Sequence, residues 1–564
     1  MKHIVMSLFA VRRVGSTRST FAVLTILTSC STASAQSPTW QEPPRLVVGV
    51  VVDQMRTDYI YRYWHNFGTG GFRRILKEGA FLRDAHFDHA PTETGPGHAS
   101  VYTGTSPSRH GIVANEMVLR PGGSLYCAGD VNVQGVGLEG VSGQRSPANL
   151  LATTLADELE RRTARASRTI GIAMKDRGAI LPIGRTGDAA YWFSGADNGA
   201  FISSTWYMDT LPAWVRAFNA RDIAATYLQG TWDLLLPRER YQQVLPDANP
   251  YEIPAAGMTE ATLPVDLAKL REAGGTGSIG YIPAGNTLTT DFALAALEAE
   301  GLGRDAVTDL LAVSYSSPDI LGHRVGPRAL ELEDMYLRLD QELERLMNAL
   351  DKQVGPGRWV LFLTADHAAP DVPQYLKDLK GSAGYIDVPK LKEDLNAALA
   401  RRFGAGNYVR LIGNDQVFLN DSLLAARKLD RAEMQRVCAQ AALRDPLVAE
   451  ALTADDLTRL EYTDGVRRLL QRGFMPQRSG DVLLAFRPGY FEGWAPLQGR
   501  GTTHGSVWNY DTHVPVLFVG RGIRACEVLR RTSITDIAPT MAMLVGMPPP
   551  DASSGAVVTE VVAP

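Results

Sequence analysis

The chain has 564 residues, of which 45% are hydrophobic and 21% are charged. This composition is that of an ordinary globular protein, and the length predicts either several domains or one large core with insertions. The formal net charge of −4 becomes −8 without the four basic residues of the first 35, because 53 basic and 61 acidic side chains remain. We therefore expect no nucleic acid binding through nonspecific charge, and any bound anion must be held locally.

A secretory signal is predicted over residues 1–35. Four basic side chains precede the apolar run Phe21–Leu27, which is too short to span a membrane, and Ala33–Ala35 fits a signal-peptidase site. Cleavage there would leave residues 36–564 in the periplasm. Cys30 ends a short apolar run, so a lipoprotein anchor is the alternative. No other apolar run approaches spanning length, and no transmembrane segment is expected.

Five apolar runs predict strands that are buried on both faces, as in a parallel sheet. They are Leu46–Val52, Thr169–Met174, Leu310–Ser316, Trp359–Ala365 and Val514–Val519. Helical periodicity begins at Ala148 and at Ala329. The alternation predicts an α/β fold with a mainly parallel central sheet sandwiched by helices. Segments at about 195–300 and about 380–500 interrupt it, and we interpret them as cap insertions in one catalytic domain over residues 36–564.

Metal-ligand side chains follow several of these predicted strands. Asp53, Asp319 and Asp366 stand at or just past strand ends, where ligands of such sheets bind. His323 lies four residues after Asp319, His367 is adjacent to Asp366, and His504 stands in a later loop. The mixture of Asp and His suits zinc, and six side chains are enough for two ions with three protein ligands each. Such a pair can stabilise both the attacking and the leaving oxygen of a phosphoryl displacement.

The stretch "TETGPGH" places Thr94 at a predicted helix start. A helix N-terminus attracts anions, because its first N–H groups are unpaired and its dipole is positive there. The Thr94 hydroxyl is therefore either an N-cap or a group that meets a phosphate. The nearby His98 is predicted to pack or to form hydrogen bonds.

These residues resemble the alkaline phosphatase superfamily of metallo-phosphohydrolases, from the Asp53 strand to Thr535–Gly546, which is similar to its final helix. The resemblance implies two zinc sites and a threonine nucleophile, Thr94, directly on the second metal. The implied ligands are Asp319, His323 and His504 for one zinc, and Asp53, Asp366 and His367 for the other. The T-x-P-x-H spacing around Thr94 also resembles the nucleotide pyrophosphatase and phosphodiesterase branch.

Lys175 and Arg177 favour monoesters over diesters, because a monoester dianion carries more charge on its nonbridging oxygens. In an extended segment, residues two apart point to the same side. With Asn115, the pair resembles the bacterial alkaline phosphatases that use a threonine nucleophile, and the resemblance gives these three residues catalytic roles. We therefore predict a zinc-dependent phosphate monoester hydrolase that forms a phosphothreonine and acts on small molecules.

Three rival functions stay open at this point. The nearest is a phosphodiesterase or nucleotide pyrophosphatase, which would share every metal ligand. The others are a phosphotransferase and a noncatalytic metal-binding protein of the cell envelope. Cys127, Cys438 and Cys526 permit at most one disulfide, their spacing pairs none of them, and the protein is expected to be a monomer. His86 receives no role, and His513 is predicted to be structural.

Overall fold

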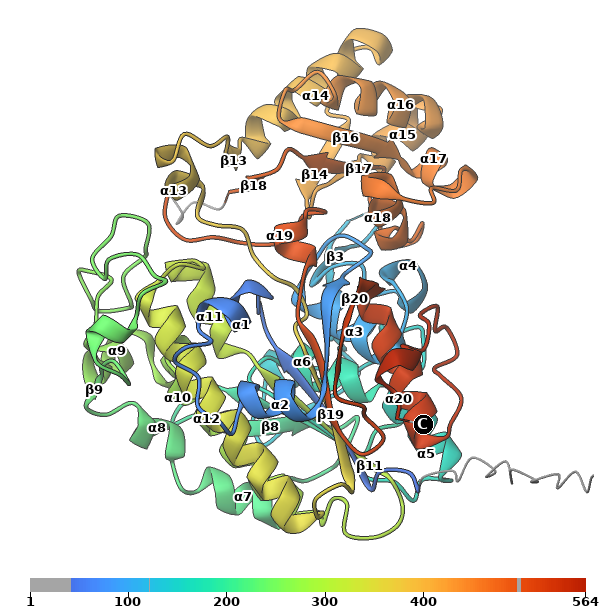
Figure 1. The fold of residues 1–564 in the computed structure, drawn as a ribbon. Coiled ribbons are helices and arrows are strands. Elements are labelled where there is room, and N and C mark those ends of the chain that lie inside the picture. The colour runs from blue at the N-terminus through green and yellow to red at the C-terminus, as the bar shows by residue number, and fades with distance from the viewer. Residues whose placement is uncertain (1–41, 121, 494–498, 564) are drawn as a thin grey trace, which may run out of the picture. The chain divides into compact units, whose positions relative to one another are not determined.

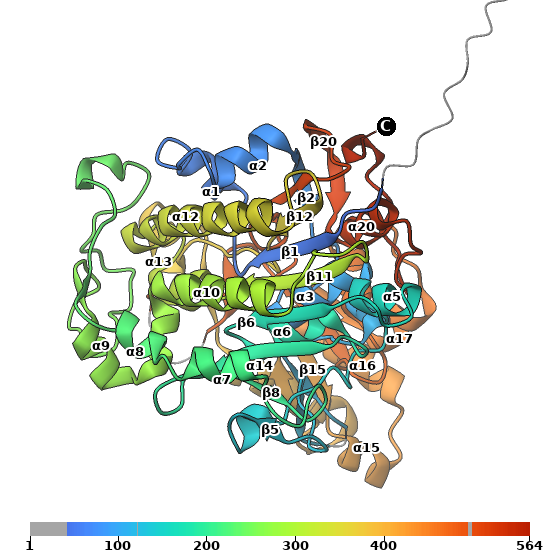
Figure 2. The same ribbon diagram turned by 90° about the horizontal axis from the view of Figure 1, so that it is seen from below.

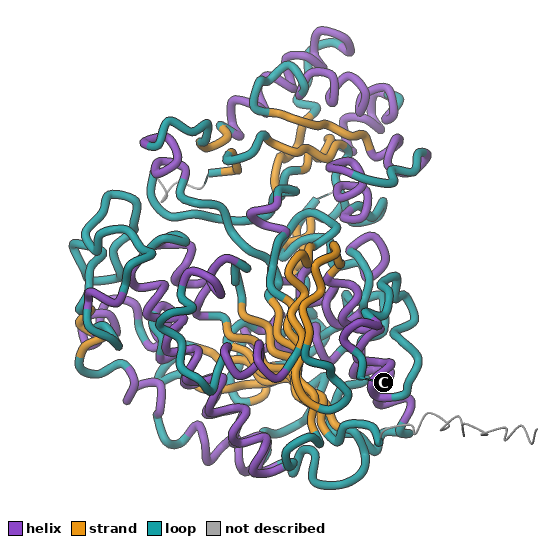
Figure 3. Tube along the Cα trace, viewed as in Figure 1, coloured by secondary structure: helices purple, strands orange, loops and turns teal. Residues whose placement is uncertain are grey.

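One ten-stranded sheet forms the centre of the computed structural model, which describes residues 42–120, 122–493 and 499–563 (Figure 3). The strands, in their order across the sheet, are β20 (Cys526–Ser533), β2 (Ala80–His86), β19 (Val516–Gly520), β12 (Trp359–Thr364), β1 (Leu46–Val52), β11 (Asp309–Tyr315), β6 (Thr169–Ala173), β7 (Ala189–Ser194), β8 (Ala200–Ser204) and β5 (Gly135–Val136). The predicted signal peptide, Cys30 included, lies outside the described residues.

The middle of the sheet is parallel. β1 pairs in parallel with β11 and β12, and β6 pairs in parallel with β11 and β7. Every residue of β1, β11 and β12 is buried, as expected for apolar strands covered on both faces. The predicted mainly parallel α/β sheet is confirmed. The run at Val514–Val519 forms β19, which is antiparallel to both β12 and β2.

Helices cover both faces of this sheet (Figures 1 and 2). One layer contains α10 (Ala284–Ala299) packed on α12 (Leu330–Gln353). The other contains α3 (Thr94–Thr103), α5 (Leu155–Arg162), α6 (Asp176–Ile183) and α20 (Ile537–Val545). The helical pattern that begins at Ala148 becomes a helix only at Leu155. The reason is a capping box, in which Thr154 and Asp157 satisfy each other's backbone N–H groups.

The two interrupting segments have different structures. Within residues 195–300, β8 joins the central sheet, and the helices α7 (Ala213–Asn219), α8 (Ile223–Tyr227) and α9 (Leu267–Gly274) follow it. Within residues 380–500, a four-stranded sheet has its own apolar core with α14 (Val388–Phe403) and α16 (Arg431–Ala442). Its strands, in order, are β14 (Val409–Gly413), β15 (Gln416–Leu419), β17 (Val482–Phe486) and β16 (Val448–Thr453). Cys127, Cys438 and Cys526 are all free thiols.

Candidate active site

The carboxyl ends of four parallel strands bring the predicted aspartates together. Asp53 directly follows β1, Asp366 follows β12, and Asp319 lies in the first turn of α11 (Ser317–Val325), just after β11. All three carboxylates are buried. Lys175, which follows β6, places its Nζ 2.7 Å from Asp53 Oδ2 and 2.5 Å from Asp319 Oδ2. Because the carboxyl ends of neighbouring parallel strands lie at the same edge of the sheet, residues far apart in the sequence form one charged cluster there.

Three histidines surround these carboxylates. His323 Nε2 lies 3.2 Å from Asp319 Oδ1, and His504 Nε2 lies 3.6 Å from the same oxygen. His367 Nε2 lies 3.4 Å from Asp53 Oδ1, and its ring stacks on that of His504 with centroids 3.5 Å apart. All six predicted ligand side chains are thus neighbours in space.

Each of these histidines presents the same nitrogen to the cluster. The Nδ1 atoms of His323, His367 and His504 lie 2.9, 3.1 and 2.7 Å from the backbone oxygens of Thr502, Ala368 and Thr92. A carbonyl oxygen only accepts, so Nδ1 carries the hydrogen and the Nε2 lone pair faces the carboxylates. Backbone bonds that orient histidine in this way are typical of metal ligands.

Unpaired buried atoms fit metal ions at this position. Among the described residues, Asp53 Oδ1, Asp366 Oδ2 and His367 Nε2 are buried without a hydrogen-bond partner. Ligand atoms lie within 4.8 Å of one another in two sets that share His367: one adds Asp53 and Asp366, the other adds Asp319 and His504. Burial, followed by repulsion from Asp319 and Asp366, raises the pKa of Asp53 well above its usual range. Cations would offset this repulsion, and the nitrogen and oxygen donors suit zinc.

Thr94 is the first residue of α3 and is buried beside this cluster. The extended Glu93 precedes the helix, so Thr94 is not its N-cap. Arg177 Nη2 donates to Thr94 Oγ1 over 3.3 Å. Gly97 lets the helix start approach the Asp366 backbone, because a Cβ at that position would stand 2.1 Å from the Asp366 oxygen.

Asn115 and Arg177 are fixed around the helix start. Asn115 Oδ1 accepts from the Gly95 N–H at 2.8 Å, and the Asn115 N–H donates to Glu93 Oε2 at 2.6 Å. Arg177 Nη1 donates to the Tyr126 hydroxyl at 3.0 Å. Hydrogen bonds therefore fix Asn115 beside Gly95 and Arg177 beside Thr94.

The expectation that Lys175 and Arg177 lie in an extended segment is wrong. Lys175 immediately precedes α6 and Arg177 lies in its first turn, since the helix begins at Asp176. The two side chains still converge on the site: Lys175 contacts the aspartates, and Arg177 contacts Thr94. Asp176, between them, accepts hydrogen bonds from Tyr126 and from Arg145 Nε, the latter at 2.6 Å.

Several supporting residues were missed in the sequence. Gln54 Nε2 donates to Asp319 Oδ1 at 2.6 Å, and the Gln54 N–H donates to Asp366 Oδ1 at 3.2 Å. Glu93 and Tyr126 hold Asn115 and Arg177. Only the position of Gln54, directly after Asp53, could have suggested a role. His98 has the hydrogen bonds that were predicted for it, to the Thr94 oxygen and the Ser314 hydroxyl, both at 2.9 Å.

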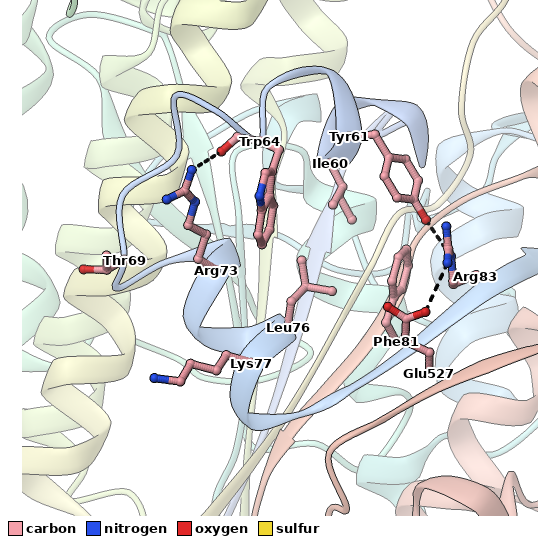
Figure 4. A pocket seen from close by; sticks show the side chains of 10 residues that line it. All are labelled: Ile60, Tyr61, Trp64, Thr69, Arg73, Leu76, Lys77, Phe81, Arg83 and Glu527. Carbon is pink, nitrogen blue, oxygen red and sulfur yellow. Dashed lines mark hydrogen bonds and ion pairs between the residues drawn. The ribbon is translucent and has the colours of Figure 1, made fainter.

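A cavity of about 720 Å³ lies elsewhere, between α1 (Asp58–Arg62), α2 (Phe72–Glu78) and β2 (Figure 4). None of the predicted site residues lines it. Its wall includes Trp64 and Arg73, and Arg83 donates to Tyr61 and Glu527 at its edge. The chemistry predicted from the sequence therefore belongs to the sheet edge and not to this cavity.

Comparison with known proteins shows the family of the chain. The sequence profile described as type I phosphodiesterase / nucleotide pyrophosphatase matches residues 47–506. The chain belongs to this family. The resemblance to the alkaline phosphatase superfamily is also confirmed. The present chain is 38% identical over 544 residues to alkaline phosphatase PafA of Elizabethkingia meningoseptica. This match covers 96% of the present chain and 98% of PafA.

A further relative of this chain has a different name, and a crystal structure of PafA matches its fold. A Myroides odoratus protein named calcium-transporting ATPase is 40% identical over 524 residues, covering 92% of this chain and 95% of its own. Among the residues that the structure describes, no helix is long and apolar enough to cross a membrane. The crystal structure of wild-type PafA has a TM-score of 0.88 at 38% identity and covers 92% of this chain and 99% of its own.

A PafA variant with one threonine, one asparagine, one lysine and one arginine substituted has the same TM-score at 37% identity. Its threonine and asparagine are 21 residues apart, and its lysine and arginine are two apart. The intervals from Thr94 to Asn115 and from Lys175 to Arg177 are the same.

Proposed function

We propose that this family member hydrolyses phosphate monoesters through a phosphothreonine at Thr94, beside two zinc ions. One observation carries the proposal: the Thr94 hydroxyl, the Arg177 guanidinium and the unpaired ligand atoms of Asp53, Asp366 and His367 meet at one edge of the sheet. The relative named alkaline phosphatase PafA, which matches nearly the whole chain, supports the reaction class. The matching intervals of its substituted residues support the roles of Thr94, Asn115, Lys175 and Arg177.

The ions would be held by the six ligand side chains, with Asp319, His323 and His504 for one, and Asp53, Asp366 and His367, joined by Thr94, for the other. When bound, zinc supplies Lewis acidity that lowers the pKa of a hydroxyl and stabilises a leaving oxygen. Nδ1 hydrogen bonds from His367 and His504 to backbone oxygens leave their Nε2 lone pairs free, and these would bind the ions.

Each residue of the site would then have a separate role in the reaction. The Thr94 hydroxyl gives up its proton as Oγ1 forms a bond to phosphorus. The bond from phosphorus to the alcohol oxygen breaks, and that oxygen takes up one proton, so the exchange is balanced. Asn115, Arg177 and the Thr94 N–H would hold the nonbridging oxygens, because Arg177 contacts Thr94 Oγ1 and Asn115 contacts the next residue, Gly95, at the helix start. Water would next cleave the phosphorus bond to Thr94 Oγ1, releasing phosphate and restoring the hydroxyl.

The charge near Thr94 favours monoesters over the diesters of the phosphodiesterase branch. Arg177 is hydrogen-bonded to Thr94 Oγ1, and Lys175 places a second positive charge between Asp53 and Asp319. These cations stabilise a dianion more than a diester monoanion. Phosphodiesterase or nucleotide pyrophosphatase activity remains the alternative function, because both activities use the same metal ligands.

The proposal is tested with purified protein, added zinc and matched aryl monoester and diester substrates. We expect monoester hydrolysis that is lost on chelation, returns with zinc and falls at least 10³-fold in Thr94→Ala. Thr103→Ala, at the other end of the same helix, should change the rate little. Faster diester than monoester turnover would replace the proposal with its alternative. Zinc binding without cleavage of either ester would favour a noncatalytic role.

We also infer that the chain is exported and that residues 1–35 are removed, with lipidation at Cys30 as the alternative. In this proposal the segments at about 195–300 and about 380–500 contribute walls for the leaving group, and the protein acts as a monomer. Mass spectrometry of the protein recovered from the periplasm would identify the N-terminal residue. A start at Gln36 supports cleavage after Ala35, and a modified Cys30 supports the anchor.

A further inference from the structure

A second cluster of metal-ligand side chains lies outside the active site. It consists of Asp84 and His86 at the end of β2, and of His513 in the segment that enters β19. One ligand atom of each residue lies within 4.8 Å of the other two. The cluster shares no residue with the six predicted zinc ligands, so the proposed reaction does not account for it.

The geometry of two paired segments creates this cluster. Asp84 and His86 are two apart on β2, so their side chains share one face of the strand. His86 and His513 form an antiparallel bridge, and their rings stack with centroids 4.7 Å apart and planes 13° apart. Arg83 lies on the opposite face, where its side chain bonds Tyr61 and Glu527 beside the cavity in Figure 4.

The hydrogen bonds of His513 leave one of its nitrogens with a lone pair. His513 Nε2 lies 2.9 Å from the Arg83 backbone oxygen, which only accepts. Nε2 therefore carries the hydrogen, and Nδ1 keeps a lone pair. This is the arrangement that a backbone carbonyl commonly imposes on a histidine ligand.

His86 can also present a lone pair. Its Nε2 lies 2.8 Å from Asp84 Oδ1, and its Nδ1 lies 3.1 Å from the Thr512 hydroxyl. Because a hydroxyl donates or accepts, Thr512 can receive a hydrogen from Nδ1 while Nε2 binds an ion. The Asp84 side chain is 43% exposed, which gives water and ions access.

We propose that Asp84, His86 and His513 bind one zinc ion, with water completing its coordination. Two imidazole nitrogens and one carboxylate oxygen are a common protein ligand set for zinc, whose ligand bonds are about 2.0–2.2 Å long. Because the two rings are stacked nearly parallel, binding one ion would require the His513 ring to turn out of the stack and the Asp84 carboxylate to turn toward it, which the partial exposure of both side chains permits. This site is independent of the proposed reaction.

The ion would brace the segment that carries an active-site ligand. His513 follows His504 by nine residues, and α19 (Asn509–Thr512) lies between them. The backbone of α19 also accepts a hydrogen bond from the Ala368 N–H at 2.8 Å, directly after His367. Tying His513 to β2 would therefore restrain the loop that positions His504, with no contact between this ion and the substrate.

The metal content of the protein shows whether these three residues bind zinc or only form hydrogen bonds with one another. Purified full-length protein is equilibrated with zinc, freed of excess metal and analysed by elemental mass spectrometry. We expect Asp84→Asn and His513→Gln each to contain about one zinc ion fewer per chain than the wild type. The conservative replacements keep polar side chains in place, and circular dichroism checks their folding. His65→Gln, at a histidine outside both clusters, should leave the zinc content unchanged.

Thermal unfolding supplies the second readout. Added zinc should raise the Tm of the wild type more than the Tm of Asp84→Asn or His513→Gln, because only the wild type has the third site. Equal zinc content in folded wild type and variants would overturn the proposal. A missing active-site pair would instead appear as the loss of two ions and of hydrolysis in every form, so the two failures are distinguishable.

Discussion

In the proposed function, the preference for monoesters depends most directly on Arg177. It reaches Thr94 Oγ1 while Tyr126 holds its other nitrogen. We expect Arg177→Ala to lower kcat/KM for an aryl monoester by about 10²–10³-fold, and for a matched diester by less than about 10-fold, because the dianion loses a charged donor. Lys175→Ala should show the same direction.

Steady-state kinetics on both esters measures these losses. Arg73→Ala, in the cavity of Figure 4, is the matched control and should leave both rates near those of the wild type. Equal losses for the two esters in Arg177→Ala would remove the argument for monoester specificity.

Residue type and local position were enough to predict part of the site. Asp53, Asp319 and Asp366 could be selected because they are carboxylates at strand ends, and the structure places them together. Asn115 entered only through the family resemblance. Tyr126 had no signal, since its role depends on the distance to Arg177 across two segments that are separate in sequence.

At the scale of elements, the start of α3 depends on a close approach to the loop after β12. A Cβ at Gly97 would meet the Asp366 backbone oxygen at 2.1 Å, so Gly97→Ala must displace the helix start or that loop. We expect at least a 10-fold loss of monoester kcat/KM, because Thr94 and Asp366 would move relative to each other. Gly413→Ala is the control, since nothing lies within 4 Å of its added Cβ. Wild-type activity in folded Gly97→Ala would contradict this account.

Apolar runs located the buried strands better than they located helix starts or strand directions. The predicted strand Leu46–Val52 has the bounds of β1, because every residue in it is buried. The helix expected from Ala148 begins at Leu155, where side-chain capping outweighs apolar spacing. The direction of β19 could not be read from its sequence, since a short apolar run fits parallel and antiparallel pairing equally well.

At the scale of the whole molecule, the sheet brings Lys175 and Arg177 close to the predicted site in a protein whose net charge is negative. Residues from Asp53 to His504 meet at one edge, although their separation in the sequence spans most of the chain. The spacing of these residues along the sequence does not predict such contacts. The order of the parallel strands in the sheet determines which strand ends are neighbours. The net charge of the chain therefore does not give the charge at one position, because Lys175 and Arg177 lie within hydrogen-bond distance of Asp53 and of Thr94.

Two buried glutamates make the stability of the whole molecule depend on pH. Burial raises the pKa of Glu252, with repulsion from Glu331 adding to it, and burial also raises the pKa of Glu331. One carboxylate oxygen of each lacks a hydrogen-bond partner among the described residues. Both groups stay protonated in the fold at a pH where the unfolded chain has released its protons, so the unfolded chain gains stability as pH rises.

The stability that these groups contribute is complete below pH ~4, the ordinary glutamate range, and is lost as pH rises through the raised folded pKa values. Glu252→Gln keeps a neutral side chain at every pH, so the free energy of unfolding should fall less between pH 6 and pH 9 than in the wild type. We expect a difference of about 1–3 kcal/mol, because each pKa unit corresponds to about 1.4 kcal/mol. Urea unfolding at the two pH values measures it, with the exposed Glu239→Gln as control. An identical pH dependence in Glu252→Gln and wild type would mean that Glu252 ionises in the fold as it does in the unfolded chain.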